Sequence, residues 1–133
     1  MNNSLFVEPN FLKNKLNDAN IKILDATFFL PDSGLNAGEE YKKEHIPNSV
    51  FFDINSIADP NNPLPHMIPS KDLFSNMMQN LGLNNEDEII IYDNSPLLSS
   101  ARAWFLLRYF GHKNILILNG GLKNWKKCGG ETT

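Results

Sequence analysis

Residues 88–111 read EIIIYDNSPLLSSARAWFLLRYFG, and this stretch predicts a strand, a loop and a helix in succession. The run 89–92 is apolar without a break and rich in β-branched residues, which is typical of a short strand covered on both faces. A loop follows at 93–98, where Asn-Ser-Pro interrupts the apolar pattern. Ser99 or Ser100 can then cap a helix over the rest of the stretch.

The loop that joins this strand to this helix is a place where chemistry is expected. Its N–H groups and the positive end of the helix point at whatever the loop holds, so they would stabilise an anion or a thiolate there. The first residues of the loop are Asp93, Asn94 and Ser95. A carboxylate therefore stands where the arrangement favours a nucleophile.

Strands and helices alternate along the remainder of the chain. Beyond the strand at 89–92, we expect four strands, at 5–7, 21–26, 50–52 and 115–118. We expect helices starting at Pro9 before Phe11, Leu12 and Leu16, spanning 37–44 and 70–81, and carrying Trp125 after Gly120-Gly121. The alternation predicts an α/β fold, with a five-stranded, mostly parallel sheet and helices on both faces. Because sites in such folds lie at the carboxyl ends of strands, Asp93 falls at the expected edge.

Composition narrows the class of protein. At 133 residues the chain has the size of one domain, and its net charge of −3 without a basic cluster predicts no nucleic-acid partner. No run approaches the roughly 18 apolar residues of a membrane span, and the first residues lack a leader pattern, so we expect a cytoplasmic protein without a membrane partner. One cysteine and three scattered histidines predict no disulfide, no metal site and no cofactor.

A long connection at 57–69 is punctuated by prolines and contains His66. Unstructured connections of this length in compact domains are often functional, so this segment is a candidate site wall. From the residues alone, His66 is interpreted as a surface histidine between prolines. His45 is interpreted as a hydrogen-bonded part of a turn, and His112 as a residue at a helix end.

Several short segments spread over the chain combine into a recognisable pattern. They are Tyr41-x-x-x-His45-Ile46-Pro47, Phe51-Phe52-Asp53-Ile54, Pro63-Leu64-Pro65-His66-Met67-Ile68-Pro69, Ile90-Ile91-Tyr92-Asp93, Ser100-Ala101-Arg102-x-Trp104, Phe110-Gly111-His112 and Asn119-Gly120-Gly121-Leu122 with Trp125. Together they resemble the rhodanese superfamily, in particular the N-terminal domain of tandem-domain 3-mercaptopyruvate and thiosulfate sulfurtransferases. The resemblance covers almost the whole chain and implies a single rhodanese-like domain, residues 1–133, that forms the N-terminal half of a two-domain protein. One departure is Asn48-Ser49, where the family usually has Gly-Ala.

The resemblance implies a reaction in which a cysteine takes sulfane sulfur from 3-mercaptopyruvate or thiosulfate as a persulfide and passes it to a thiol or cyanide. Asp93 stands where active family domains place that cysteine, and a carboxylate is too hard and weak a nucleophile to hold a persulfide. This chain alone is therefore predicted to be inactive. The implied partners are a second, catalytic rhodanese domain, a small-molecule sulfur donor and a thiol acceptor.

The resemblance also implies a supporting role for His66 at the interdomain cleft, where imidazole can move a proton near neutral pH. Its acidic partner in the family corresponds to Asn55, which can hydrogen-bond but carries no charge. Arg102 either closes the loop onto Asp93 through a charge-assisted hydrogen bond or is an exposed charge on the helix. Cys128 follows two lysines at the end of the last helix, where the helix dipole disfavours a thiolate, and is interpreted as structural or incidental.

Two other functions compete with this reading. The chain is alternatively a free-standing inactive rhodanese module that binds a partner or regulates. A phosphatase function, suggested by relatives of the fold that share the anion-binding loop, fails because phosphoryl transfer there also requires a cysteine at the position of Asp93.

Overall fold

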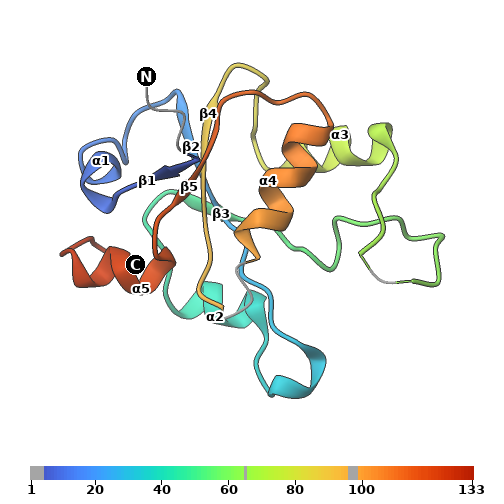
Figure 1. Ribbon diagram of the computed structural model, residues 1–133, viewed down its shortest axis with the longest axis horizontal. Coiled ribbons are helices and arrows are strands. Elements are labelled where there is room, and N and C mark those ends of the chain that lie inside the picture. Colours follow the sequence, from blue (N-terminus) through green and yellow to red (C-terminus); the bar gives the residue numbers. More distant parts are fainter. Residues whose placement is uncertain (1–4, 65, 96–98) are drawn as a thin grey trace.

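A computed structural model describes residues 5–64, 66–95 and 99–133 of the protein. Its centre is a five-stranded sheet in the order β1-β5-β4-β2-β3, and every neighbouring pair of strands is parallel. The predicted α/β class and five-stranded sheet are confirmed, and Figure 1 shows the sheet seen nearly edge-on in the middle of the molecule. The strands are β1 (Phe6–Val7), β2 (Ile21–Asp25), β3 (Ser49–Phe51), β4 (Glu88–Tyr92) and β5 (Ile115–Leu118).

Helices cover both faces of the sheet. In Figure 1, α3 and α4 lie to the right of the sheet, whereas α1 and α5 lie to the left. The helical elements are α1 (Pro9–Lys13), the 3-10 turn η1 (Pro31–Ser33), α2 (Ala37–Lys43), α3 (Lys71–Asn80), α4 (Ser100–Tyr109) and α5 (Gly121–Lys127). Among the described residues, no helix combines the length and the apolar character that crossing a membrane would require.

Both faces of β4 are buried, which explains why residues 89–92 are all apolar or aromatic. Ile89 and Ile91 pack into a cluster with α3 and α4, whereas Ile90 and Tyr92 pack into a second cluster with α1 and α5. Successive side chains of a strand point to opposite faces, so a strand buried on both faces must be apolar at every position. Each of these isoleucines is fully buried, which stabilises the fold by about 1.5–3 kcal/mol per side chain.

Some element boundaries differ from the sequence prediction. The helix that begins at Pro9 ends at Lys13, so Leu16 lies beyond it and packs against the second core cluster from a turn. The strand expected at 50–52 covers 49–51 instead, although the backbone N–H of Phe52 still donates to the carbonyl of Asp25 in the neighbouring strand at 2.8 Å. Both differences fall at ends of elements, where local pattern is least informative.

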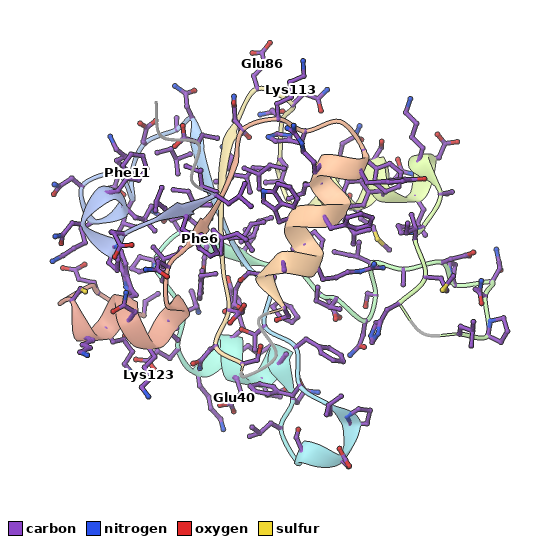
Figure 2. The ribbon with its side chains drawn as sticks, in the orientation of Figure 1. Phe6, Phe11, Glu40, Glu86, Lys113 and Lys123 are labelled. Carbon is purple, nitrogen blue, oxygen red and sulfur yellow. The ribbon has the colours of Figure 1, made fainter. Side chains whose placement is uncertain are left out.

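The two ends of the sheet differ in what they carry. Figure 2 shows Glu86 and Lys113 at the end where β4 and β5 begin, and Lys123 and Glu40 at the opposite end. The carboxyl ends of the strands point toward that second end, next to α2 and the amino end of α5. The long connections after β2, β3 and β4 therefore meet on one side of the molecule.

Candidate functional site

The candidate site lies where the order of the strands reverses. β2 and β4 are neighbours, but the chain leaves β2 toward β3 at one edge and leaves β4 toward β5 on the other side. Such a switch point opens a crevice at the carboxyl ends of the two strands, which is where ligands bind in open α/β sheets. The segments that leave this crevice start at Ala26 and at Asp93, and the Ala26 N–H donates to the Tyr92 carbonyl at 2.8 Å.

Asp93 is buried at the amino end of α4. Its Oδ2 atom accepts hydrogen bonds from the Ser100 N–H at 2.9 Å and from the Ser100 hydroxyl at 2.6 Å. The helix dipole and its free N–H groups favour a negative charge at this point. The carboxylate of Asp93 therefore occupies the place where the sequence predicted a stabilised anion.

The cap of α4 differs from the sequence prediction. Ser99 has the N-cap position, but its side chain makes no capping bond and donates instead to the Ala26 carbonyl at 2.5 Å. Ser100 is the first residue of the helix and donates to Asp93. The acceptor for the first turn thus comes from Asp93 across the loop, and residues 96–98 of that predicted loop lie outside the described residues.

A buried carboxylate that sequence reasoning missed fixes the other side of the loop. Asp25 is 2% exposed, and its Oδ1 accepts from the Thr27 hydroxyl at 2.6 Å and from the Thr27 N–H at 3.0 Å. The Thr27 hydroxyl oxygen in turn accepts from the Asn94 N–H at 2.9 Å. Asp25 therefore holds Asn94 through Thr27. The signal in the sequence was an aspartate at the end of an apolar strand, two residues before a threonine.

Burial raises the pKa of Asp25 above its ordinary value, and the negative charge of Asp93 acts in the same direction. Hydrogen bonds from Thr27 and Tyr92 act against this rise. Tyr92 is itself buried, and its hydroxyl accepts from the Ile46 N–H at 3.1 Å and lies 3.2 Å from the Ser49 hydroxyl. Burial and the charge of Asp25 raise the pKa of Tyr92. Its hydroxyl therefore stays protonated and connects β4 to the turn after α2.

A glycine pair allows the chain to approach Asp93 closely. Gly121 has a φ of +64°, and a Cβ atom at this position would lie 2.3 Å from the Asp93 carbonyl oxygen. The same carbonyl accepts from the Leu122 N–H at 3.0 Å. A pocket of about 700 Å³ opens beside Asp93 between the ends of β4 and β5, with Asn94, Ser95 and Lys123 in its wall. Lys123 points into solvent at this end of the molecule (Figure 2).

His66 lies in the long connection after β3, and Pro65 beside it lies outside the described residues. Its Nε2 atom is 2.8 Å from Asn55 Oδ1, and its ring packs edge-on against the ring of Phe28, with a centroid distance of 4.9 Å. Asn55 is positioned by a turn in which its N–H donates to Asp53 Oδ1 at 3.0 Å. His66 has a φ of 60°, which is uncommon for a residue other than glycine.

Arg102 takes neither of the two places that the sequence suggested. Its guanidinium donates a hydrogen bond to the main-chain carbonyl of His66. Within the described part of the chain, no ion pair joins Arg102 to Asp93. The side chain is also partly buried, and this burial lowers the pKa of the guanidinium. The structure thus brings together two sets: Asp93 with Ser100, and His66 with Asn55 and Arg102.

The remaining candidate residues lie apart from these sets. His45 Nδ1 is 2.7 Å from the Tyr41 carbonyl, and His112 Nε2 is 2.8 Å from the Asp87 carbonyl at the opposite end of the sheet. Cys128 is exposed after the end of α5, and its Sγ is 3.7 Å from Asn124 Oδ1. In residues 5–64, 66–95 and 99–133, no group of three or more His, Cys, Asp or Glu side chains could hold a metal ion.

Comparison with known proteins identifies the architecture. The model of the rhodanese-like domain matches residues 8–128. The chain is 40% identical over 128 residues to 3-mercaptopyruvate sulfurtransferase of Escherichia coli K12, covering 96% of the chain and 46% of that protein. It is 39% identical over 123 residues to thiosulfate/3-mercaptopyruvate sulfurtransferase 1, mitochondrial, of Arabidopsis thaliana, covering 92% of the chain and 32% of that protein.

Solved structures agree with the sequence matches. The crystal structure of SseA from Escherichia coli, a 3-mercaptopyruvate sulfotransferase, superposes with a TM-score of 0.89 at 40% identity, over 94% of this chain and 48% of that one. The Tum1 protein of Saccharomyces cerevisiae superposes with a TM-score of 0.84 at 30% identity, over 99% of this chain and 44% of that one. The chain spans less than half the length of these relatives. The resemblance predicted from the motifs is confirmed: the chain belongs to the rhodanese-like domain family.

Proposed function

We propose that this chain is the N-terminal domain of a two-domain sulfurtransferase of the mercaptopyruvate or thiosulfate type. The intact protein would move sulfane sulfur from 3-mercaptopyruvate or thiosulfate to a thiol or cyanide, with the reacting cysteine in the second domain. Relatives that carry these names support the reaction class. The share of those relatives that the chain covers, between 32% and 46%, leaves room for a second domain of similar size.

The observation that carries the proposal is that Asp93 is buried and hydrogen-bonded to Ser100. Its carboxylate is 7% exposed and accepts two hydrogen bonds from Ser100, so it serves as a structural anion. A carboxylate does not form a persulfide, because sulfur transfer requires a soft thiolate nucleophile. Cys128, the one cysteine, lies on the surface after α5 and does not line the pocket beside Asp93. The domain alone is therefore proposed to be inactive.

In this proposal His66 supports proton transfer at the cleft between the two domains. When the cysteine thiolate of the second domain attacks the sulfur of mercaptopyruvate, the carbon–sulfur bond breaks and the pyruvate enolate leaves and takes up a proton. The His66 Nε2–H donates to Asn55 Oδ1, which leaves Nδ1 free of a proton in the neutral ring. His66 is therefore oriented to accept a hydrogen bond from a group that the second domain would present.

A second candidate, a free-standing inactive module that docks a partner, has one observation in its favour. Leucine and methionine side chains in the connection between β2 and α2 and in the connection that contains His66 are exposed and available for another polypeptide to cover. These residues are Leu30, Leu35, Leu64 and Met67. The intact mass of the native protein separates the two functions. If the protein isolated from its source has about the mass of this chain, 15.1 kDa, it has no room for a catalytic half.

An activity assay tests the main proposal directly. The 133-residue chain is incubated with mercaptopyruvate or with thiosulfate and cyanide, and pyruvate or thiocyanate is measured. We expect no turnover above the rate without protein, whereas the intact two-domain protein turns over. Turnover by the isolated chain that is abolished in Cys128→Ser would overturn the proposal. We further propose a cytoplasmic location, which fractionation of cells that express the intact protein would check.

A further inference from the structure

We infer that Arg102 is the positioning residue for His66: it ties the loop that carries the histidine to α4 and so sets the direction of the imidazole. The inference rests on the proposed role of His66 at the cleft. It also gives α4, the helix after Asp93, the role of holding the loop that carries His66.

His66 is held at three points by three different parts of the chain. Arg102 of α4 donates to its main-chain carbonyl. Asn55, after β3, bonds its Nε2 atom at 2.8 Å, and Phe28, after β2, packs against its ring. The two contacts to the ring orient the imidazole only if the backbone beneath it is fixed. Arg102 supplies that backbone contact.

The loop around His66 needs such a contact. It contains no helix or strand between β3 and α3 among the described residues, and His66 itself has a φ of 60°. A left-handed backbone at a histidine persists only when the surroundings hold it. A backbone bond from Asp59 N–H to the Met67 carbonyl, at 2.9 Å, closes the loop locally, and Ile57 and Ile68 pack in or against the core cluster on either side of it. Arg102 adds a hydrogen bond from α4 to the main chain of His66 itself.

Arg102 is well suited to this task because its helix is rigid. Ala103, Leu106 and Leu107 anchor α4 in the core cluster that also contains β4. The guanidinium of Arg102 is planar, always charged and partly buried, so it needs a hydrogen-bond acceptor. Asp93 is not that acceptor in this structure, since the described residues contain no ion pair between the two side chains and Arg102 donates to His66 instead. The carbonyl of His66 fills the requirement.

A nuclear magnetic resonance experiment on the protein tests the contact without any assay of activity. The readouts are the nuclear Overhauser effect between the rings of His66 and Phe28 and the side-chain amide shifts of Asn55. We expect Arg102→Met to reduce the ring contact to less than half of its wild-type intensity and to move the Asn55 amide toward its solvent-exposed value. Arg102→Lys, which can still donate to the carbonyl, should retain most of the ring contact.

The matched control is Arg108→Met, because Arg108 is exposed in the last turn of the same helix. It removes the same charge and should leave both readouts unchanged. Wild-type values in Arg102→Met, or equal losses in both variants, would overturn the inference. Far-ultraviolet circular dichroism of each variant verifies the fold. If Arg102→Met does not fold, the same two readouts are compared between Arg102→Lys and Arg102→Ala, and equal values in these two variants would overturn the inference.

The intact two-domain protein then gives the functional readout. We expect Arg102→Met to lower kcat about tenfold with KM within about twofold, since general acid–base groups contribute about 10²–10⁴-fold and here the group is displaced, not removed. Arg102→Lys should recover most of kcat. If the wild-type protein has no sulfurtransferase activity, the proposed function fails while the magnetic resonance result still decides the contact. If it is active and kcat is unchanged in Arg102→Met, the positioning role is wrong.

Discussion

Asp93 and Ser100 form a closed pair in which one carboxylate oxygen receives both the N–H and the hydroxyl of the serine, at 2.9 and 2.6 Å. The side chain of Asp93 therefore caps the first residue of the helix that follows it. Because a cap of this kind stabilises a helix by about 0.5–2 kcal/mol, the residue at position 93 has a structural task that a cysteine cannot take over.

The first prediction concerns Asp93→Cys. We expect this substitution to restore little sulfur transfer and to lower the free energy of unfolding by about 1 kcal/mol, because the thiol is a poor acceptor for Ser100. Urea unfolding and a thiocyanate assay measure the two effects. Asp93→Asn is the control, since it keeps an acceptor oxygen and should lose less stability. Sulfur transfer by Asp93→Cys at the rate of an active family member would contradict the prediction.

The second prediction concerns Asp25 and pH. Burial raises the pKa of Asp25 in the folded chain above the unfolded value of 3.8, so across this window the folded chain binds more protons than the unfolded chain. The stability that protonated Asp25 contributes is complete below pH 3.8 and is lost as pH rises through the folded-state pKa. Asp25→Asn should remove this decline, while its amide oxygen still accepts from Thr27.

Urea unfolding of wild type and Asp25→Asn at a series of pH values measures the effect. The free energy of unfolding of wild type minus that of the variant should fall with rising pH above pH 3.8 and then level off. Asp32→Asn is a control for the removal of one carboxylate from the surface, because Asp32 is exposed in η1. A difference between wild type and Asp25→Asn that rises with pH would show that the carboxylate is stabilised in its charged form.

The third prediction compares two glycines. Gly121→Ala forces a left-handed backbone on alanine and places its Cβ 2.3 Å from the carbonyl of Asp93, whereas at Gly34 the added Cβ meets nothing within 4 Å. We expect Gly34→Ala to cost about 1 kcal/mol for the backbone alone. Gly121→Ala should cost more by about 2 kcal/mol or fail to fold, since main-chain atoms must shift. Equal losses in thermal or urea unfolding would mean that the approach to Asp93 is not constrained.

The fourth prediction explains the departure at Asn48, where the family usually has glycine. Asn48 has a φ of 68°, and its side-chain amide donates to the Leu16 carbonyl at 2.7 Å. Asparagine tolerates this backbone better than other residues with a Cβ. Asn48→Gly should therefore change the free energy of unfolding by less than about 0.5 kcal/mol, whereas Asn48→Ala should lose about 1 kcal/mol or more. Urea unfolding of the two variants tests the difference, and equal values would exclude the explanation.

Much of the fold could be predicted from local pattern. The uninterrupted run 89–92 indicated a strand buried on both faces, and the alternation of strands with helices indicated parallel pairing. These features depend on residues that are neighbours in sequence. Element ends were less predictable, as the early end of α1 at Lys13 shows.

The side-chain partners in the site could not be predicted, because they join segments far apart in the chain. Arg102 meets the carbonyl of His66, 36 residues away in the sequence, and no pattern within α4 indicates that direction. Asp25 reaches Asn94 only through Thr27, and a single aspartate at a strand end does not show whether it is buried. The motifs identified Asp93 and His66 as candidate residues, but only the structure shows which side chains contact them.

The close approach of Gly121 to the carbonyl of Asp93 also limits how a domain of this kind could acquire a thiol at position 93 in evolution. A mutation that installs a thiol meets a loop already fixed at its main chain by α5 and at its side chain by α4. The first step on that route weakens the fold before any catalytic benefit appears. Selection would then oppose the intermediate, so a thiol at position 93 would be difficult to acquire one substitution at a time.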